Sequence, residues 1–96
     1  MRADVLIYLT SWCPYCHAAK ELLGDKNVPF AEVDVDGRQE LRAWLTKTTG
    51  QRTVPQVFIN GKPVGGFNDI SALDRAGKLD ALLSEAPPVE MAALPR

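Results

Sequence analysis

The stretch Val5-Leu6-Ile7-Tyr8-Leu9-Thr10-Ser11-Trp12-Cys13-Pro14-Tyr15-Cys16 joins a short apolar run to a Cys-x-x-Cys pair. The run 5–9 is rich in β-forming residues and too short for a helix, which predicts a strand buried on both faces. Apolar or small residues then recur with helical spacing up to Gly24, at Tyr15, Ala18, Ala19, Leu22 and Leu23. Both cysteines are therefore expected in the first turn of a helix that follows a central strand.

The next segment predicts a second strand and a second helix. Residues 30–35 alternate between apolar and polar types, as a half-buried strand does. A helical stripe then ends before Gly50 and consists of Leu41, Trp44, Leu45 and Thr48. The first half of the chain is thus predicted to be strand, helix, strand, helix.

The second half predicts a β-hairpin followed by short helices. Residues 56–59 precede Asn60-Gly61, a strong signal for a two-residue hairpin turn. Pro63 cannot donate a ladder hydrogen bond, so the returning strand 62–66 is expected at the sheet edge. Asn68 or Asp69 is expected to cap a helix that breaks at Gly77, before a last turn bearing Leu79, Leu82 and Leu83. This order predicts an α/β fold with a mixed four-stranded sheet between helices.

Length and composition limit the domain organisation. The chain has 96 residues, of which 46% are hydrophobic and 24% are charged. A chain of this length forms one domain, so two domains are excluded. We expect that domain to span residues 1–85, because Ala86-Pro87-Pro88 ends regular structure. Residues 86–96 are expected to form a loosely ordered tail.

The charge balance limits the partners. Eleven basic and twelve acidic residues give a net charge of -1, so no global positive field attracts nucleic acid or anionic lipid. No apolar run approaches the ~20 residues of a membrane-spanning helix, and residues 1–4 lack the apolar region of a secretion signal. We therefore expect a cytoplasmic protein that binds neither nucleic acid nor membranes.

The motif Cys13-Pro14-Tyr15-Cys16 contains both cysteines of the chain. Two cysteines are too few for a fold that is stabilised by several disulfides, and in the cytoplasm a structural pair of cysteines would stay reduced. With His17 the motif also matches the signature of c-type haem attachment, which requires export, and it offers too few ligands for a closed zinc site. An inert core pair is a further possibility, but a helix start favours reactivity. Reversible thiol-disulfide chemistry without a metal is the favoured interpretation.

The position of the motif indicates which cysteine attacks. A free thiol with a pKa of ~8.5 is only a few per cent thiolate at neutral pH, and the thiolate is the nucleophile. A helix dipole contributes at most ~1–2 kcal/mol, whereas a hydrogen bond to a charged group contributes ~1.5–3 kcal/mol. Pro14 has no N–H, so the expected donors to Cys13 are the Tyr15 and Cys16 amides and the Cys16 thiol. Cys13 is thus expected to be the exposed nucleophile and Cys16 the buried resolving partner.

Three segments occur together: the motif 13–16 after a strand, the segment 52–61 containing Thr53-Val54-Pro55, and the segment 65–69. Together they resemble the dithiol glutaredoxin family of the Cys-Pro-Tyr-Cys type, and the resemblance covers about residues 5–83. It implies a thioredoxin-like fold with sheet order 2-1-3-4 and strand three antiparallel to strand one. It also implies a glutathione-dependent thiol-disulfide oxidoreductase that reduces protein-glutathione mixed disulfides and protein disulfides.

The resemblance further implies how glutathione binds, as a reductant and not as a tightly bound cofactor. Val54-Pro55 would contain a cis peptide bond facing the nucleophile, so that an extended ligand pairs with Val54. The helix start after Gly66 would hold the γ-glutamyl end, because free amides bind its carboxylate and Asp69 can meet its ammonium. The residues implied for glutathione are Tyr15, Arg42, Arg52, Thr53, Val54, Pro55, Gly66, Phe67, Asn68 and Asp69.

One departure from the family pattern removes an expected positive charge. Many glutaredoxins carry a Lys three residues before the first cysteine, where this chain has Thr10. We expect Arg52, with Arg42, to supply the cation that the glycine carboxylate of glutathione needs. The expected partners of this chain are glutathione and glutathionylated or disulfide-containing proteins, and the chain is expected to be a monomer.

Two alternative functions stay open at the level of sequence. Some glutaredoxin relatives hold a [2Fe-2S] cluster between two chains with two glutathiones, and Trp12 precedes the motif in some of them. Pro14 argues against this function, because it stiffens the loop that would admit the cluster. The other alternative is a thioredoxin-like reductase that is coupled to thioredoxin reductase.

Overall fold

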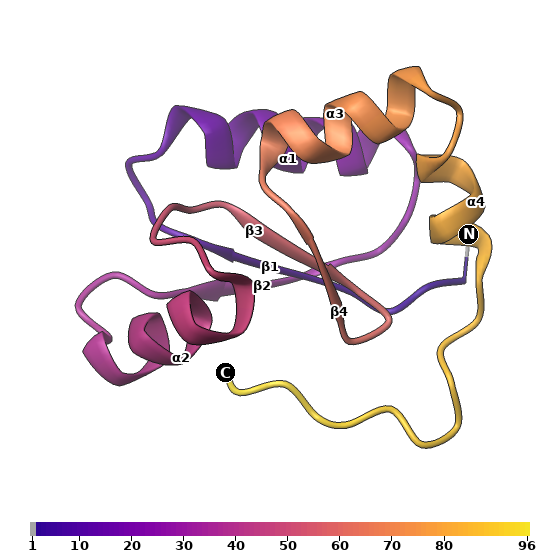
Figure 1. Ribbon diagram of the computed structural model, residues 1–96. Coiled ribbons are helices and arrows are strands. Elements are labelled where there is room, and N and C mark those ends of the chain that lie inside the picture. Colours follow the sequence, from indigo (N-terminus) through magenta and orange to yellow (C-terminus); the bar gives the residue numbers. More distant parts are fainter. Residues whose placement is uncertain (1) are drawn as a thin grey trace.

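The computed structural model describes residues 2–96, which contain four strands and four helices (Figure 1). The strands are β1 (Val5–Leu9), β2 (Ala31–Asp34), β3 (Gln56–Ile59) and β4 (Lys62–Gly65). The helices are α1 (Pro14–Asp25), α2 (Gln39–Thr49), α3 (Phe67–Arg75) and α4 (Leu79–Ser84). This order confirms the predicted succession of elements.

The four strands form one mixed sheet in the order β2-β1-β3-β4. β2 is parallel to β1, while β3 is antiparallel to both of its neighbours. The predicted sheet order, the antiparallel third strand and the edge position of β4 are therefore confirmed. None of the helices within residues 2–96 is both long enough and apolar enough to span a bilayer.

β1 separates two apolar cores, because its side chains alternate between the two faces of the sheet. Val5, Ile7 and Leu9 pack with residues of α1, α3 and α4, whereas Leu6 and Tyr8 pack with residues of α2. Figure 1 shows the same layering, with α1 and α3 above the sheet and α2 below it. All five residues of β1 are buried, as the continuous apolar run predicted. The central strand thereby holds the loop at its carboxyl end, which leads into α1.

Two predicted helix boundaries were wrong. α1 runs past Gly24 to Asp25, because Lys26 continues in the right-handed region before the chain turns. α3 begins at Phe67, with Gly66 as its cap, and not after Asn68 or Asp69. The Asp69 carboxylate lies in the first turn and accepts a hydrogen bond from the Gly66 N–H at 2.9 Å. Asp69 therefore caps the helix from its third position, as the acidic residue of a capping box does.

The hairpin turn follows the prediction closely. Asn60 and Gly61 have φ angles of 53° and 80°, so both adopt the left-handed conformation of a type I′ turn. The Asn60 side chain also accepts a hydrogen bond from the Asp4 N–H at 2.8 Å. The turn is thereby tied to the start of β1.

Residues 86–96 run from α4 along the α2 side of the sheet (Figure 1). The hydroxyl of Tyr8, whose side chain is fully buried, donates a hydrogen bond to the Pro95 carbonyl at 2.6 Å. Arg38 donates to the Arg96 carbonyl at 2.7 Å, and Leu94 packs against the α2 core. The loose order expected of this tail, and the domain boundary at residue 85, stay predictions.

Removing the tail tests the boundary. We expect a chain ending at Glu85 to fold and to keep its activity, but to lose about 1–3 kcal/mol of unfolding free energy. The loss comes from the Tyr8 hydrogen bond and from the apolar contact of Leu94. Urea denaturation of both chains measures it. Tyr8→Phe should cost about 1 kcal/mol in the full chain and less in the short one, since both changes remove the same bond. An unfolded short chain would contradict the boundary.

Candidate active site

Cys13 lies directly before α1 and caps it. Its backbone is extended, with φ -124° and ψ 108°, and Pro14 occupies the first helical position. The Cys13 sulfur accepts a hydrogen bond from the Cys16 N–H at 3.1 Å. Of the two backbone amides that were predicted as donors, those of Tyr15 and Cys16, only the Cys16 amide donates to the Cys13 sulfur. A cap side chain reaches the third helical residue from this position, which accounts for the difference.

The opposite side of the Cys13 sulfur faces the segment before β3. The thiol donates toward the Val54 carbonyl oxygen at a sulfur-oxygen distance of 3.7 Å. The Val54-Pro55 bond is cis, as the resemblance implied. Cys13 is half-buried, and Val54 also packs against the α1 core. The Cys13 thiol therefore lies between the start of α1 and the segment that leads into β3.

Cys16 has the opposite environment. Its side chain is 1% exposed and packs in the apolar core between the sheet, α1 and α3. Burial, followed by a hydrogen bond to Cys13, raises the pKa of the Cys16 thiol to about 12. The backbone of Thr10 and the charge of Lys20 act in the other direction on that pKa. The two thiols are free in this structure and differ in access, since Cys13 is half-buried and Cys16 is fully buried.

A groove of about 300 Å³ runs beside the motif. The start of α3 forms one wall, where Gly66 approaches the Pro55 carbonyl so closely that a Cβ there would lie 3.1 Å from its oxygen. The rings of Tyr15 and Phe67 lie 6.4 Å apart, and Tyr15 is 59% exposed. The lining residues are Tyr15, Gln51, Thr53, Val54, Pro55, Gly66, Phe67, Asn68 and Asp69.

The groove brings together every residue predicted for glutathione except Arg42 and Arg52. Both arginines lie outside its lining, and Arg42 donates a hydrogen bond to the Arg52 carbonyl at 3.3 Å. Arg52 is exposed and stands in sequence between two lining residues, Gln51 and Thr53. The sequence analysis missed Gln51. Its position two residues before Thr53, in the segment that leads into β3, was the available signal.

Of the other side chains that the sequence analysis singled out, two are exposed near the motif and one lies on the far side of the sheet. Trp12 is 92% exposed beside Cys13, and His17 is exposed on α1. Trp44, a member of the predicted apolar stripe, is half-buried on the far side of the sheet, where it packs against the α2 core and stacks on Phe58 at a centroid distance of 5.8 Å. Within residues 2–96, no group of three or more His, Cys, Asp or Glu residues could hold a metal ion.

Comparisons with known proteins agree with this geometry. The family model described as Glutaredoxin matches residues 5–64. A glutaredoxin of Pseudomonas aeruginosa is 58% identical over 80 residues, which are 83% of this chain and 95% of that protein. Glutaredoxin 3 of Escherichia coli is 48% identical over 81 residues, or 84% of this chain and 98% of that protein. A crystal structure of a buckwheat glutaredoxin-glutathione complex matches with a TM-score of 0.81 at 32% identity, covering 85% of this chain and 77% of that one.

Proposed function

Because the chain belongs to the glutaredoxin family and is a glutathione-dependent thiol-disulfide oxidoreductase, we propose that Cys13 is its nucleophile and Cys16 its resolving cysteine. The observation that carries this assignment is the position of Cys13. Its sulfur caps α1 by accepting a hydrogen bond from the Cys16 N–H, and it faces the Val54 carbonyl. Cys16 is enclosed by apolar side chains, so a substrate disulfide reaches Cys13 first.

The proposed cycle starts with a glutathionylated protein. The Cys13 thiolate attacks the glutathionyl sulfur, a Cys13-glutathione disulfide forms, and the protein thiolate leaves with the electron pair and takes up a proton. A second glutathione thiolate then attacks the glutathionyl sulfur on Cys13. Glutathione disulfide leaves, and Cys13 returns to the thiolate. For a protein disulfide, Cys16 performs the second attack, and two glutathiones later reduce the Cys13-Cys16 bond.

We propose that glutathione lies in the groove beside the motif. The extended segment at Val54 offers backbone groups to a peptide, in the manner of an added strand. The start of α3 offers free N–H groups to the γ-glutamyl carboxylate, and Asp69 offers a carboxylate to its ammonium. The glutathione complex of the buckwheat relative is consistent with this assignment.

We also propose the substrates, the oligomeric state and the location of the protein. Glutathionylated and disulfide-containing proteins are the proposed substrates, because Cys13 is only half-buried and its neighbour Trp12 is 92% exposed. The proposed state is a monomer. The cytoplasm is the proposed compartment, since the reaction consumes reduced glutathione and the cytosolic pool is kept reduced. No observation favours the iron-sulfur or thioredoxin-like alternatives over this function.

The source of electrons tests the function. We expect the oxidised protein to be reduced by glutathione, with glutathione reductase and NADPH regenerating the glutathione, and to be reduced by thioredoxin reductase at least about tenfold more slowly. A reduction potential in the glutaredoxin range, about -200 to -230 mV, lets the glutathione pool reduce the protein, whereas thioredoxin, at about -270 mV, depends on its own reductase. NADPH consumption in the two coupled systems measures the ratio. Faster reduction by thioredoxin reductase would overturn the proposal, and a coloured protein after purification would support the cluster alternative.

Two substitutions test the glutathione subsites. We expect Asp69→Asn to raise the KM for a glutathionylated peptide about tenfold, because the charge facing the ammonium is lost while an amide oxygen can still accept from Gly66. Arg52→Ala should raise this KM only about threefold, because solvent screens the charge of Arg52, which is exposed and outside the groove lining. Asp25→Asn, at the far end of α1, is the matched control. An unchanged KM for Asp69→Asn together with a large increase for Arg52→Ala would reverse the assignment.

A further inference from the structure

The proposed roles of Cys13 and Cys16 do not explain how the Cys16 thiol loses its proton. The path inferred for that proton rests on these proposed roles. Cys16 can attack a mixed disulfide on Cys13 only as a thiolate. The Cys16 side chain is 1% exposed, and its thiol is hydrogen-bonded to Cys13. In the mixed disulfide Cys13 is bonded to glutathione and cannot take up this proton, so the proton needs an exit on another side of Cys16.

A second hollow lies beside Cys16. It has a volume of about 260 Å³ and shares no lining residue with the groove. Cys16 lines this hollow and Cys13 does not. Its walls come from the end of β1, the following loop, α1 and β2, and they consist of Leu9, Thr10, Ser11, Cys16, His17, Lys20, Glu32 and Asp34. Since one water occupies about 30 Å³ of liquid, the hollow has room for water beside the buried thiol.

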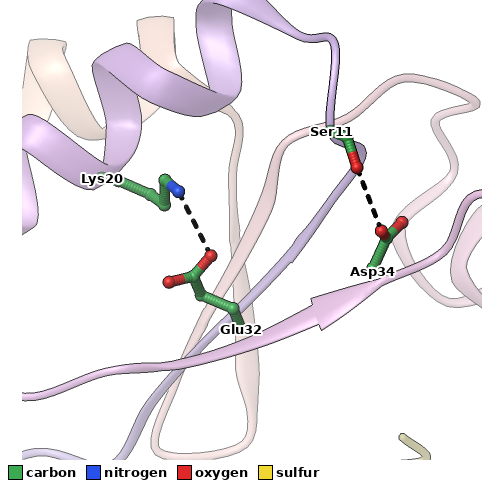
Figure 2. A network of polar contacts seen from close by, with 4 residues as sticks. All are labelled: Ser11, Lys20, Glu32 and Asp34. Carbon is green, nitrogen blue, oxygen red and sulfur yellow. Dashed lines mark hydrogen bonds and ion pairs between the residues drawn. The ribbon is translucent and has the colours of Figure 1, made fainter.

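Two polar contacts cross the hollow between α1, the loop and β2 (Figure 2). The Lys20 ammonium pairs with a Glu32 carboxylate oxygen at 3.3 Å. The Ser11 hydroxyl donates to Asp34 at 3.3 Å. The side chains of Lys20 and Glu32 are 31% and 45% exposed, so the pairing with Glu32 keeps the ammonium at the wall of the hollow.

The position of Lys20 on α1 places its charge on the side of Cys16. Residues four apart lie on the same face of a helix, and Lys20 is four residues after Cys16. The other charged or titratable groups of this region are Cys13 and His17 near the helix start and Glu32 and Asp34 on β2. The two carboxylates are engaged by Lys20 and Ser11, and α3 presents apolar Ile70 to the same core. Lys20 is therefore the one cation, among the described residues that line the hollow, aligned with the resolving thiol.

We propose that this hollow is the proton exit of the resolving cysteine and that Lys20, positioned by Glu32, stabilises the Cys16 thiolate. In this step Cys16 transfers its proton to water in the hollow. The thiolate then attacks the Cys13 sulfur, the Cys13-Cys16 bond forms, and the bond from Cys13 to glutathione breaks. Glutathione leaves as a thiolate and takes up a proton from solvent. The charge of Lys20 assists the formation of the Cys16 thiolate and takes no covalent part.

The experiment separates the two attacks. Reduced protein is mixed with excess glutathione disulfide, quenched in acid, alkylated and weighed by mass spectrometry, from about pH 6 to pH 9. The first phase joins glutathione to Cys13, and the second phase releases it as the Cys13-Cys16 bond closes. The variants are Lys20→Gln, Lys20→Arg and, as a matched control on the exposed face of α2, Lys47→Gln.

We expect Lys20→Gln to slow ring closure about three- to tenfold throughout the range from about pH 6 to pH 9, because loss of the positive charge makes the Cys16 thiolate harder to form. The first phase should stay within about twofold of the parent chain. Lys20→Arg keeps the charge and should restore closure, and Lys47→Gln should change neither phase.

Three results would overturn the proposal. One is an unchanged closure rate in Lys20→Gln. Another is equal slowing of both phases, which would place the effect of the charge on Cys13. The third is a Lys20→Arg variant as slow as Lys20→Gln, which would indicate packing and not charge. Cys16→Ser in the same experiment keeps the proposed function separate: release of glutathione without Cys16 would refute the resolving role itself, whatever Lys20 does.

Discussion

Cys13→Ser is expected to lower both deglutathionylation and protein disulfide reduction by at least about 10³-fold. The reason is the difference in access between the two thiols. Cys13 lies beside the groove and faces the Val54 carbonyl, whereas Cys16 is 1% exposed behind it. No other cysteine exists in the chain to take over the attack. Initial rates of NADPH consumption, coupled through glutathione reductase, measure the loss with a glutathionylated peptide and with a peptide disulfide.

Serine is a suitable replacement because it preserves the helix start. Serine is a favoured cap residue, and its hydroxyl oxygen can accept the Cys16 N–H that the Cys13 sulfur accepts now. We expect the unfolding free energy of the variant to stay within about 1 kcal/mol of the parent chain. A folded variant that kept a tenth of the parent activity would refute Cys13 as the nucleophile.

The part of the site that sequence analysis predicted depends on local patterns. A buried strand followed by a helix with regular apolar spacing places Cys13 at the helix start, whatever the rest of the chain does. Asn60-Gly61 specifies its turn in the same local way. The cap of α3 was predicted wrongly because Gly66 has no side chain to signal it, and because Asp69 acts backward from the first turn.

The features that sequence analysis could not predict depend on partners distant along the chain. Lys20 and Glu32 meet only because α1 packs over β2, which runs parallel to β1. Tyr8 finds its carbonyl partner 87 residues later, in a tail with no periodic pattern. Arg52 looked suitable as a groove cation by its place beside Thr53, but the lining of the groove passes from Gln51 to Thr53 without it.

The second large effect is expected from Cys16. We expect Cys16→Ser to lower the reduction of a peptide disulfide by at least about 10²-fold and to keep deglutathionylation within about threefold of the parent chain. Deglutathionylation needs a second glutathione to attack the adduct on Cys13, and that attack approaches from the open groove. Reduction of a disulfide needs an internal attack on Cys13, for which the Cys16 sulfur is hydrogen-bonded to Cys13 and no other thiol is present.

The same variant should trap its substrates. Without the internal attack, the disulfide between Cys13 and a substrate peptide persists until glutathione cleaves it, so mass spectrometry should detect this adduct at low glutathione. A hydroxyl among the apolar neighbours of residue 16 costs about 1–3 kcal/mol, and Cys16→Ala avoids that cost while removing the same thiol. Both variants should therefore give the same split between the two activities. If either one reduced the peptide disulfide at the parent rate, a single cysteine would suffice for both reactions, and the burial of Cys16 would have to serve the fold alone.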